Sequence, residues 1–376
     1  MSIVATPVEI DDPSNSAILF VSEDRIQGFS EDPFGEIAEL SGVPVDTVVE
    51  RIRLMVEAGT IRRVRQTLMA TNLAKGALIA WQIPADKLDA AFNYMFENDP
   101  FTGHVVVRST DTATTGSAFR LWTTLKVPQG YSIEKHCEFL ASKTGALSCK
   151  IMPAKRLFVL GVGHMRRRTI EPGARSDEPA EAHDTEIVEL SDLDWQVLVA
   201  LKREFEASEI KRDAWSARAT EAGVDLETFC RVAKSLNERK VIGRFSTFLE
   251  HVKPTAGEKR VTKYNALFHW AVPQGRELEA GSEVGRHLIM THAYWRDGGP
   301  EFGGVNIMGV AHGLEKDAIL LHKAAIDAHL EEAGIPITYT NVFWGGRSEI
   351  KPSEISPIAY REFCAANGLD PASMRV

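Results

Sequence analysis

Residues 43–64 read VPVDTVVERIRLMVEAGTIRRV, and residues 224–245 read VDLETFCRVAKSLNERKVIGRF. The two stretches align without a gap at an offset of 181 residues, close to half of the 376-residue chain. Each combines an amphipathic, helix-like run with a short β-prone run at its end. A unit that recurs at this distance is a whole domain rather than a module of a repeat array.

Two more echoes follow each copy in the same order. Residues 81–84 (WQIP) correspond to residues 270–273 (WAVP), and residues 104–108 (HVVVR) correspond to residues 292–296 (HAYWR). Three echoes in one order indicate a tandem of two halves. Because the copies have diverged heavily, we expect them to perform different tasks.

The repeated stretch predicts a winged helix in each half. In the first half, a helical pattern before Ser41-Gly42 and a second one over residues 45–57 are followed by Gly59 and the β-prone residues 60–64. Gly59 ends the second helix. Helix, turn, helix and strand in this order are typical of winged-helix domains.

The residues after each winged helix alternate between strand and helix patterns. In the first half, strands are predicted at 77–83, 103–109, 119–126 and 157–163, and helices at 85–98 and 132–144. The order βαββαβ predicts a ferredoxin-like domain. The predicted fold class is therefore α+β: a tandem of winged helix-turn-helix and ferredoxin-like units, with the sheets packed face to face as a pseudo-dimer.

These patterns divide the chain into successive segments. The acidic stretch 169–190, rich in proline and alanine, suits a linker between the halves. The predicted segments are a disordered tail (1–17), winged helix 1 (18–75), ferredoxin-like domain 1 (76–168), the linker (169–190), winged helix 2 (191–255), ferredoxin-like domain 2 (256–350) and a C-terminal tail (351–376) with a short helix near 357–366.

Composition places the chain among ordinary globular proteins. It is 44% hydrophobic and 25% charged, and no apolar run approaches the ~20 residues of a membrane span. The N-terminus lacks a signal-peptide pattern and the four cysteines lack CxxC spacing, so we expect reduced thiols, a cytoplasmic location and no membrane partner. A net charge of −9 disfavours non-specific binding of nucleic acid, which depends on neutralising phosphates.

In each half, a winged helix followed by βαββαβ resembles the layout of the Lrp/AsnC family of transcription regulators. Four motifs resemble those of the siroheme decarboxylases, which are relatives of these regulators. They are Gln27-Gly28-Phe29 with Pro33-Phe34, Val241–Phe245 (VIGRF), His104–Arg108 with Leu121–Leu125 (LWTTL), and His292–Arg296 with Asn306–Gly313 (NIMGVAHG). A diverged tandem is unusual for those regulators. It is similar instead to the siroheme decarboxylases, relatives whose two different subunits are fused in some cases.

The resemblance to siroheme decarboxylases implies a lyase of heme biosynthesis. Those enzymes remove carboxyl groups from acetate side chains of an iron tetrapyrrole. Such a reaction needs arginine to hold carboxylates through paired hydrogen bonds, and histidine to supply a proton near neutral pH. The metallated macrocycle can take up negative charge itself, so we expect no cofactor beyond the iron tetrapyrrole substrate and no protein-bound metal.

The second half offers the richer set of such side chains. Alternate residues of a strand share a face, which groups His292 with Tyr294 and Arg296, and groups the alternate residues from Asn306 to His312 on the next strand. We expect the catalytic residues to be His292 and His312, and the substrate-binding residues to be Arg296, Tyr294, Asn306 and Met308.

The first half lacks a second histidine on its partner strand, so we expect it only to assist binding. Its candidates are His104, Arg108 and Trp122. Arg244 and Arg347 are further candidates for binding the carboxylates of the substrate.

Two other functions remain open. A DNA-binding regulator of the Lrp/AsnC type would need a basic recognition helix, whereas residues 46–57 carry Asp46, Glu50 and Glu57 against only two arginines. We therefore expect no specific nucleic-acid partner. A tetrapyrrole-binding protein without catalysis is the third candidate, and a homodimer of the fused chain is left open.

Overall fold

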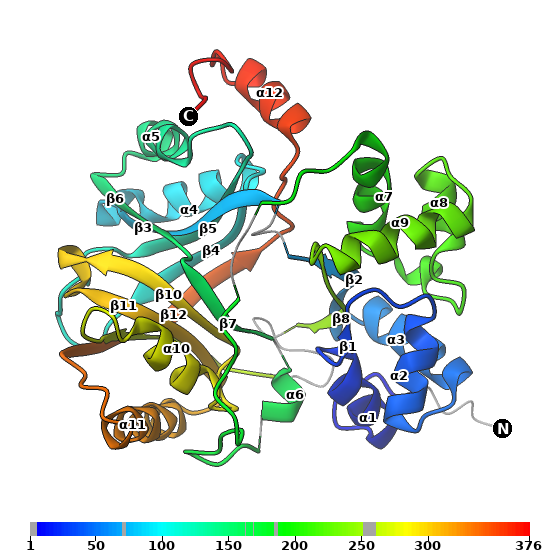
Figure 1. Cartoon of the computed structure of the whole chain (residues 1–376), viewed down its shortest axis with the longest axis horizontal. Coiled ribbons are helices and arrows are strands. Elements are labelled where there is room, and N and C mark those ends of the chain that lie inside the picture. Colours follow the sequence, from blue (N-terminus) through cyan, green and yellow to red (C-terminus); the bar gives the residue numbers. More distant parts are fainter. Residues whose placement is uncertain (1–5, 70–72, 162, 168, 184–186, 251–260) are drawn as a thin grey trace. The chain divides into compact units, whose positions relative to one another are not determined.

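The structure is a computed structural model that describes residues 6–69, 73–161, 163–167, 169–183, 187–250 and 261–376. The chain forms two compact units, each described here by itself (Figure 1). The first comprises residues 1–69, 162–169 and 188–263, and the second comprises residues 70–161, 170–187 and 264–376. Each unit therefore combines segments from both halves of the sequence.

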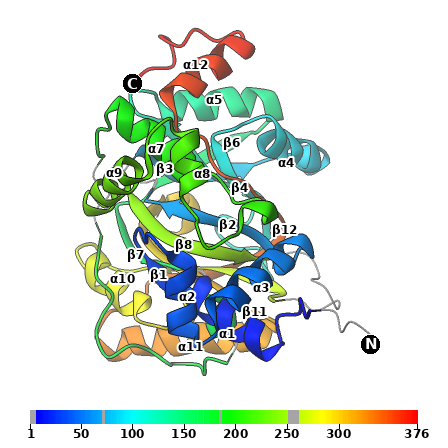
Figure 2. The ribbon, with the colours of Figure 1, turned by 90° about the vertical axis from the view of Figure 1, so that its right-hand side faces the viewer.

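The first unit contains both copies of the repeated stretch. Helix α3 (Val45–Glu57) and strand β2 (Ile61–Leu68) correspond residue for residue to α9 (Leu226–Glu238) and β8 (Ile242–Leu249), as the ungapped alignment predicts. Strands β1, β8 and β2 form one antiparallel sheet, so β2 and β8 lie side by side (Figure 2). The other elements are α1 (Pro13–Ser22), β1 (Ile26–Gln27), α2 (Pro33–Ser41), α6 (His164–Arg167), α7 (Asp192–Lys202), η3 (Ala207–Glu209) and α8 (Ser216–Glu221).

Side-chain caps fix the helix boundaries in this unit. Asp32 accepts a hydrogen bond from Gly35 N at the start of α2, and Asp225 accepts one from Thr228 N at the start of α9. Gly42 is left-handed, with a φ of 71°, and ends α2 before the turn into α3. Helix, turn, helix and strand thus follow in the predicted order.

The expected disordered tail at 1–17 is wrong for its described part. Helix α1 begins at Pro13, and the Asp12 carboxylate caps it by accepting from Ser14 N and Asn15 N, both at 3.1 Å. Ile10 is fully buried and ties the segment to the core. Asp12 as the cap and Pro13 at the first helical position are a signal for the start of a helix. The sequence analysis did not use this signal because the segment is rich in polar residues.

The second unit contains two ferredoxin-like βαββαβ folds, as predicted. The first fold comprises β3 (Ala74–Gln82), α4 (Leu88–Glu97), β4 (Thr102–Ser109), β5 (Leu121–Pro128), α5 (Ile133–Thr144) and β6 (Ser148–Pro153). The second comprises β9 (Tyr264–Ala271), α10 (Glu277–Gly285), β10 (His292–Gly299), β11 (Val305–Gly313), α11 (Lys316–Glu332) and β12 (Tyr339–Ile350). Single 3-10 turns, η2 (Ala85–Lys87) and η4 (Pro300–Phe302), lie at two of the connections.

The strands of both folds form one continuous sheet in the order β6-β3-β5-β4-β12-β9-β11-β10-β7. Antiparallel pairing of β4 with β12 joins the folds edge to edge. Each fold also has an inner face, the side of its sheet that its helices do not cover. The two inner faces pack against each other around Trp122, Met308 and Phe343. Helices α4 and α5 cover the outer face of one fold, and α10 and α11 cover that of the other (Figure 1). The two folds thus form the predicted pseudo-dimer, and the pairing of β4 with β12 adds an edge-to-edge junction to the predicted face-to-face packing.

Two segments pair differently from the prediction. The stretch 157–163 does not close the first fold: β6 closes it, and β7 (Arg156–Leu160) pairs with β10 of the second fold. The predicted linker also packs on the second fold, since Ser176 N donates to Arg286 O. The sequence pattern predicts β7 as a strand, but it could not show that this strand pairs with the open edge of β10.

The predicted helix near 357–366 is confirmed as α12 (Pro357–Ala366). It is not a free tail, because Tyr360 and Phe363 pack into the core of the first fold. Their rings lie 4.8 Å and 5.4 Å from that of Phe101, between centroids. The last helix of the chain therefore completes the fold that the first half begins.

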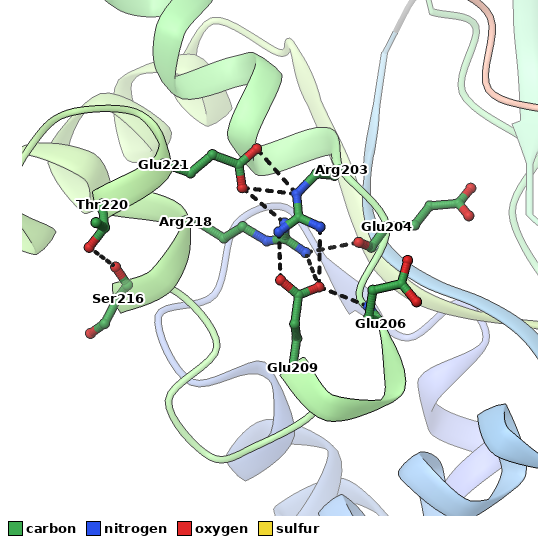
Figure 3. A network of polar contacts seen from close by, with 8 residues as sticks. All are labelled: Arg203, Glu204, Glu206, Glu209, Ser216, Arg218, Thr220 and Glu221. Carbon is green, nitrogen blue, oxygen red and sulfur yellow. Dashed lines mark hydrogen bonds and ion pairs between the residues drawn. The ribbon is translucent and has the colours of Figure 1, made fainter.

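A buried arginine ties α8 to the η3 turn in the first unit. Arg218 is 1% exposed, and its guanidinium donates to Glu221 at 3.2 Å, to Glu209 at 3.1 Å and to the Glu204 carbonyl at 2.9 Å (Figure 3). Arg203 binds the same two carboxylates with 40% of its side chain exposed. The two arginines therefore share partners but differ in burial.

Arg218→Ala should lower the free energy of unfolding of the first unit by ~2–4 kcal/mol, because it removes the buried cation from two carboxylates. Arg203→Ala should lower it by less than ~1 kcal/mol, since exposed ion pairs contribute little. Urea titrations followed by tryptophan fluorescence measure both changes. Equal losses in the two variants would contradict this difference.

Candidate functional site

Three side chains stack on the inner face of β10. The His292 and Tyr294 rings are nearly parallel, with centroids 6.1 Å apart and planes at 18°. The Arg296 guanidinium lies 4.4 Å from the centroid of the Tyr294 ring. The three residues occupy alternate positions of one strand and share a face, as the sequence predicts.

A threonine that the sequence analysis did not identify lies between the two predicted catalytic histidines. The Thr291 hydroxyl is 3.2 Å from His292 Nδ1 and 3.4 Å from His312 Nδ1. It also donates to Val310 O at 2.9 Å. Val310 is the residue paired with His292 across β10 and β11, so His312 follows two residues later on the neighbouring strand. The structure thus brings both histidines to one hydroxyl.

A row of residues across four strands links His312 to the first fold. Arg108 on β4 is paired with Gly345 on β12, Gly345 with Asn265 on β9, and Asn265 with His312 on β11. The Arg108 guanidinium donates to Asn265 Oδ1 at 3.1 Å, and Asn265 Nδ2 lies 2.9 Å from His312 Nε2. A Cβ at Gly345 would lie 3.2 Å from that of Asn265, so the glycine leaves this row open.

Burial sets the charge state of the groups near this row. Arg108 is 5% exposed, and burial lowers its pKa to about 9, so it remains a cation at neutral pH. On β9, burial and then the positive charge of Arg108 lower the pKa of His269 to about 3. His269 is therefore neutral at physiological pH. The sequence analysis missed this histidine, although it directly precedes Trp270 of the second echo.

Arg296 is buried rather than open to solvent. Its Nη1 donates to Met152 O at 2.5 Å, and burial lowers its pKa. Met152 belongs to β6 of the first fold, so this contact crosses between the two inner faces. The two arginines of the third echo, Arg108 and Arg296, thus each reach across to the opposite fold.

Three other predicted binding residues have partners within the fold itself. Asn306 accepts from Val272 N at 2.9 Å and donates to Val272 O at 2.8 Å. Met308 is 1% exposed between the inner faces. Trp122 is fully buried there, and its indole N–H donates to Phe119 O at 2.8 Å.

Two further candidates bind neighbours elsewhere in the second unit. His104 Nε2 lies 2.8 Å from Ser348 Oγ. Arg347 pairs with Asp89 at 3.0 Å, and its guanidinium lies 4.0 Å from the centroid of the Phe92 ring. Both of these partners belong to α4, so the structure does not bring Arg347 to the histidines.

Arg244 belongs to the first unit. Its Nε donates to Glu23 O at 3.3 Å, and its guanidinium shares the Phe248 ring with that of Arg65, at 5.9 Å and 5.3 Å. Burial lowers the pKa of Arg65 to about 10 and raises the pKa of Glu23 to about 7. This unit therefore holds a partly buried group of cations.

The inner faces of the second unit combine paired imidazoles with two buried cations. Imidazole transfers protons near neutral pH, and guanidinium binds carboxylates. In the described ranges, no group of three or more His, Cys, Asp or Glu side chains could hold a metal ion. Among the same residues, no helix has the length and hydropathy needed to span a bilayer.

His269→Gln should make the protein less sensitive to acid. Its pKa of about 3 lies below the ordinary value of 6.5, so between these values the unfolded chain binds a proton that the folded chain does not. Stability therefore falls as the pH drops below ~6.5, by about 2 kcal/mol from pH 7 to pH 5 for this group. Urea titrations at both pH values should show this loss reduced in the variant and unchanged in His183→Gln, a control at an exposed histidine.

Comparisons with known proteins agree with this architecture. Residues 73–158 match the family described as AsnC-like ligand binding domain. A crystal structure of the siroheme decarboxylase NirDL has a TM-score of 0.64 at 19% sequence identity, covering 95% of this chain and 100% of that chain. A second NirDL structure, in co-complex with an iron-uroporphyrin III analogue, gives 0.63 at 18% identity, covering 94% and 99%. No curated protein matches the sequence. The chain thus shares its fold with NirDL over nearly its whole length.

Proposed function

We propose that the chain is a tetrapyrrole decarboxylase that removes carboxyl groups from acetate side chains of siroheme or a related iron tetrapyrrole. The observation that carries the proposal is the hydrogen-bonded set of His292, His312 and Arg108 on the inner faces of the second unit. The shared fold with NirDL supports it, and the iron-uroporphyrin III analogue bound to NirDL supports a tetrapyrrole as the ligand.

The reaction would need bound carboxylates and one delivered proton per carboxyl group removed. Loss of carbon dioxide breaks the bond between the carboxyl carbon and the methylene carbon, and the electron pair stays with the methylene carbon. That carbon then takes a proton and becomes a methyl group. The metallated macrocycle of the substrate can delocalise the developing charge, so we propose no added cofactor. The protein would supply orientation, exclusion of water and the proton.

Arg296 and Arg108 are the proposed carboxylate-binding groups. Both are buried cations, and a guanidinium binds carboxylate most strongly away from water. Arg296 would exchange its bond to Met152 O for one to a substrate oxygen, while Tyr294 holds its guanidinium beside His292. We propose His292 as the proton donor because it belongs to the same stack.

The other predicted residues receive supporting roles in this proposal. Trp122 and Met308 would form an apolar wall for the macrocycle, and Asn306 would hold the end of β9 in place. His104 remains a proposed auxiliary group. Arg244 and Arg347 remain proposed contacts for outer carboxylates, although Arg347 would first have to leave Asp89.

The regulator hypothesis has less support. Glu50 and Glu57 are exposed on α3, and Arg53 on the same helix pairs with Glu57 at 2.8 Å. Few cations therefore remain on this helix for phosphates. We propose no specific nucleic-acid partner, no membrane partner and a cytoplasmic location. Binding of a tetrapyrrole without catalysis is the second candidate, and homodimerisation of the fused chain stays a proposal.

Anaerobic mixing of the purified protein with siroheme tests the proposal. We expect a shift of the Soret band and products lighter than siroheme by one or two carbon dioxide units in mass spectrometry. A Soret shift without any change of mass would favour the non-catalytic binding protein. No shift, together with nanomolar retention of one promoter fragment, would favour the regulator.

Arg296→Ala should weaken tetrapyrrole binding by ~10- to 100-fold, because a charge-assisted hydrogen bond contributes ~1.5–3 kcal/mol. Arg296→Lys should recover only part of this loss, since lysine keeps the charge and lacks the planar fork. Absorbance titrations measure both affinities. Arg361→Ala is the matched control and should bind as wild type does, because this exposed arginine of α12 lies outside the proposed site. Wild-type affinity in Arg296→Ala would contradict the proposed placement.

His292→Ala should lose far more activity than His104→Ala. Loss of a proton donor lowers the rate by ~100-fold or more. His104 contacts Ser348 and lies outside the stack on β10, so its removal should leave most of the activity. Single-turnover decarboxylation followed by mass spectrometry compares the two variants. Equal losses would show that both halves take part in proton transfer.

A further inference from the structure

A chain of hydrogen bonds with only one allowed direction runs from Arg108 to His312. A guanidinium can only donate, so the oxygen of the Asn265 amide must face Arg108, at 3.1 Å from Nη1. The nitrogen of that amide, which also can only donate, then faces His312 Nε2 at 2.9 Å. His312 Nε2 is therefore an acceptor and carries no proton. A neutral His312 must hold its proton on Nδ1.

The contacts of Thr291, at the other end of this series of hydrogen bonds, lead independently to the same assignment. Thr291 has one hydroxyl proton, and the shortest of its three hydroxyl contacts is the one to Val310 O, at 2.9 Å, so we assign the proton to this bond. The two lone pairs of the hydroxyl then accept from His292 Nδ1 at 3.2 Å and from His312 Nδ1 at 3.4 Å. Both rings thus carry a proton on Nδ1.

We infer that Asn265 and Thr291 are positioning residues that fix the ring protons of the two histidines, so that His312 stays neutral and His292 exchanges its proton through Nε2. Protonating His312 would set Nε2–H against the Asn265 amide N–H, donor against donor. His292 can be protonated without reversing its bond to Thr291, because its Nδ1 already donates. The two histidines are therefore not equivalent, which revises the expectation that both are catalytic.

The charged and titratable groups on the same inner faces agree with this difference. Arg108 from β4 is a buried cation behind Asn265, and it further opposes a positive charge on His312. His269 from β9 is neutral at physiological pH. On β10, Tyr294 lies between His292 and Arg296. The assignment of His292 as donor to a substrate rests on the proposed function, whereas the direction of the hydrogen bonds does not.

Nitrogen-15 NMR of substrate-free protein with labelled histidine tests the direction of these bonds. Two-bond proton–nitrogen correlations distinguish the tautomers, and a His312→Gln variant assigns the resonances. We expect His312 to remain neutral with its proton on Nδ1 from pH 8 to pH 5, while His292 titrates in this range. A His312 that carries its proton on Nε2, or that titrates as an exposed histidine does, would overturn the inference.

Asn265→Asp provides a sharper version of this measurement. A carboxylate in place of the amide would accept from His312 Nε2 and reverse that bond. We expect the titration of His312 to move upward by ~1 to 3 pH units relative to wild type. The carboxylate would also pair with Arg108, so the row should stay intact. An unchanged tautomer and titration in this variant would overturn the role of Asn265.

Thr291 is tested by Thr291→Val, which keeps the branched shape and removes the hydroxyl, with Thr291→Ser as the matched control. We expect mixed tautomers of His292 in the valine variant and the wild-type tautomer in the serine variant. With siroheme, the valine variant should lose ~10- to 100-fold in kcat with little change in KM, and serine should restore it. If the tautomers hold but wild type does not decarboxylate siroheme, the proposed function fails and the positioning role stands. Wild-type tautomers in Thr291→Val would overturn that role.

Discussion

Pairing of β4 with β12 is the constraint on which the second unit depends. It turns two four-stranded sheets into one and places Arg108 of one fold in line with Asn265 and His312 of the other. Backbone hydrogen bonds between the two strands fix this register. The register alone therefore brings the polar side chains of the two folds together. A slip of β12 by one residue that puts Trp344 at this position would turn Gly345 away from the row and set an indole ring between Arg108 and Asn265.

Local patterns predicted those parts of the fold that local interactions determine. The repeated helix and strand of residues 43–64 and 224–245 form as expected, because amphipathic spacing and the turn at Gly42 act within a few residues. The pairing of β7 with β10 could not be predicted in this way, because the choice of an edge strand depends on which edge remains open in the assembled sheet. The start of helix α1 was missed because Ser14, Asn15 and Ser16 after its cap are polar, and the apolar residues begin only at Ala17.

The same division applies to the candidate site. His292, Tyr294 and Arg296 share a face because strand alternation requires it, and the sequence alone was sufficient for that statement. Thr291 and Asn265 were not predicted, because their importance comes from partners on neighbouring strands rather than from their own surroundings in the sequence. Conversely, Asn306 and Arg347 looked available and have partners in Val272 and Asp89 that no local pattern reveals.

Strand β7 and helix α12 each complete the fold that the opposite half of the sequence builds. The two folds of the second unit are therefore interlocked, and they are not independent domains that follow one another along the chain. A gene divided near its midpoint would yield fragments that each lack an element of their own fold, because the other fragment carries it, so they would have to complement one another to fold. Fusion also fixes the ratio of the two halves at one to one. Because each half always has the other half as its partner, each could diverge in sequence without keeping a surface that binds a second copy of itself.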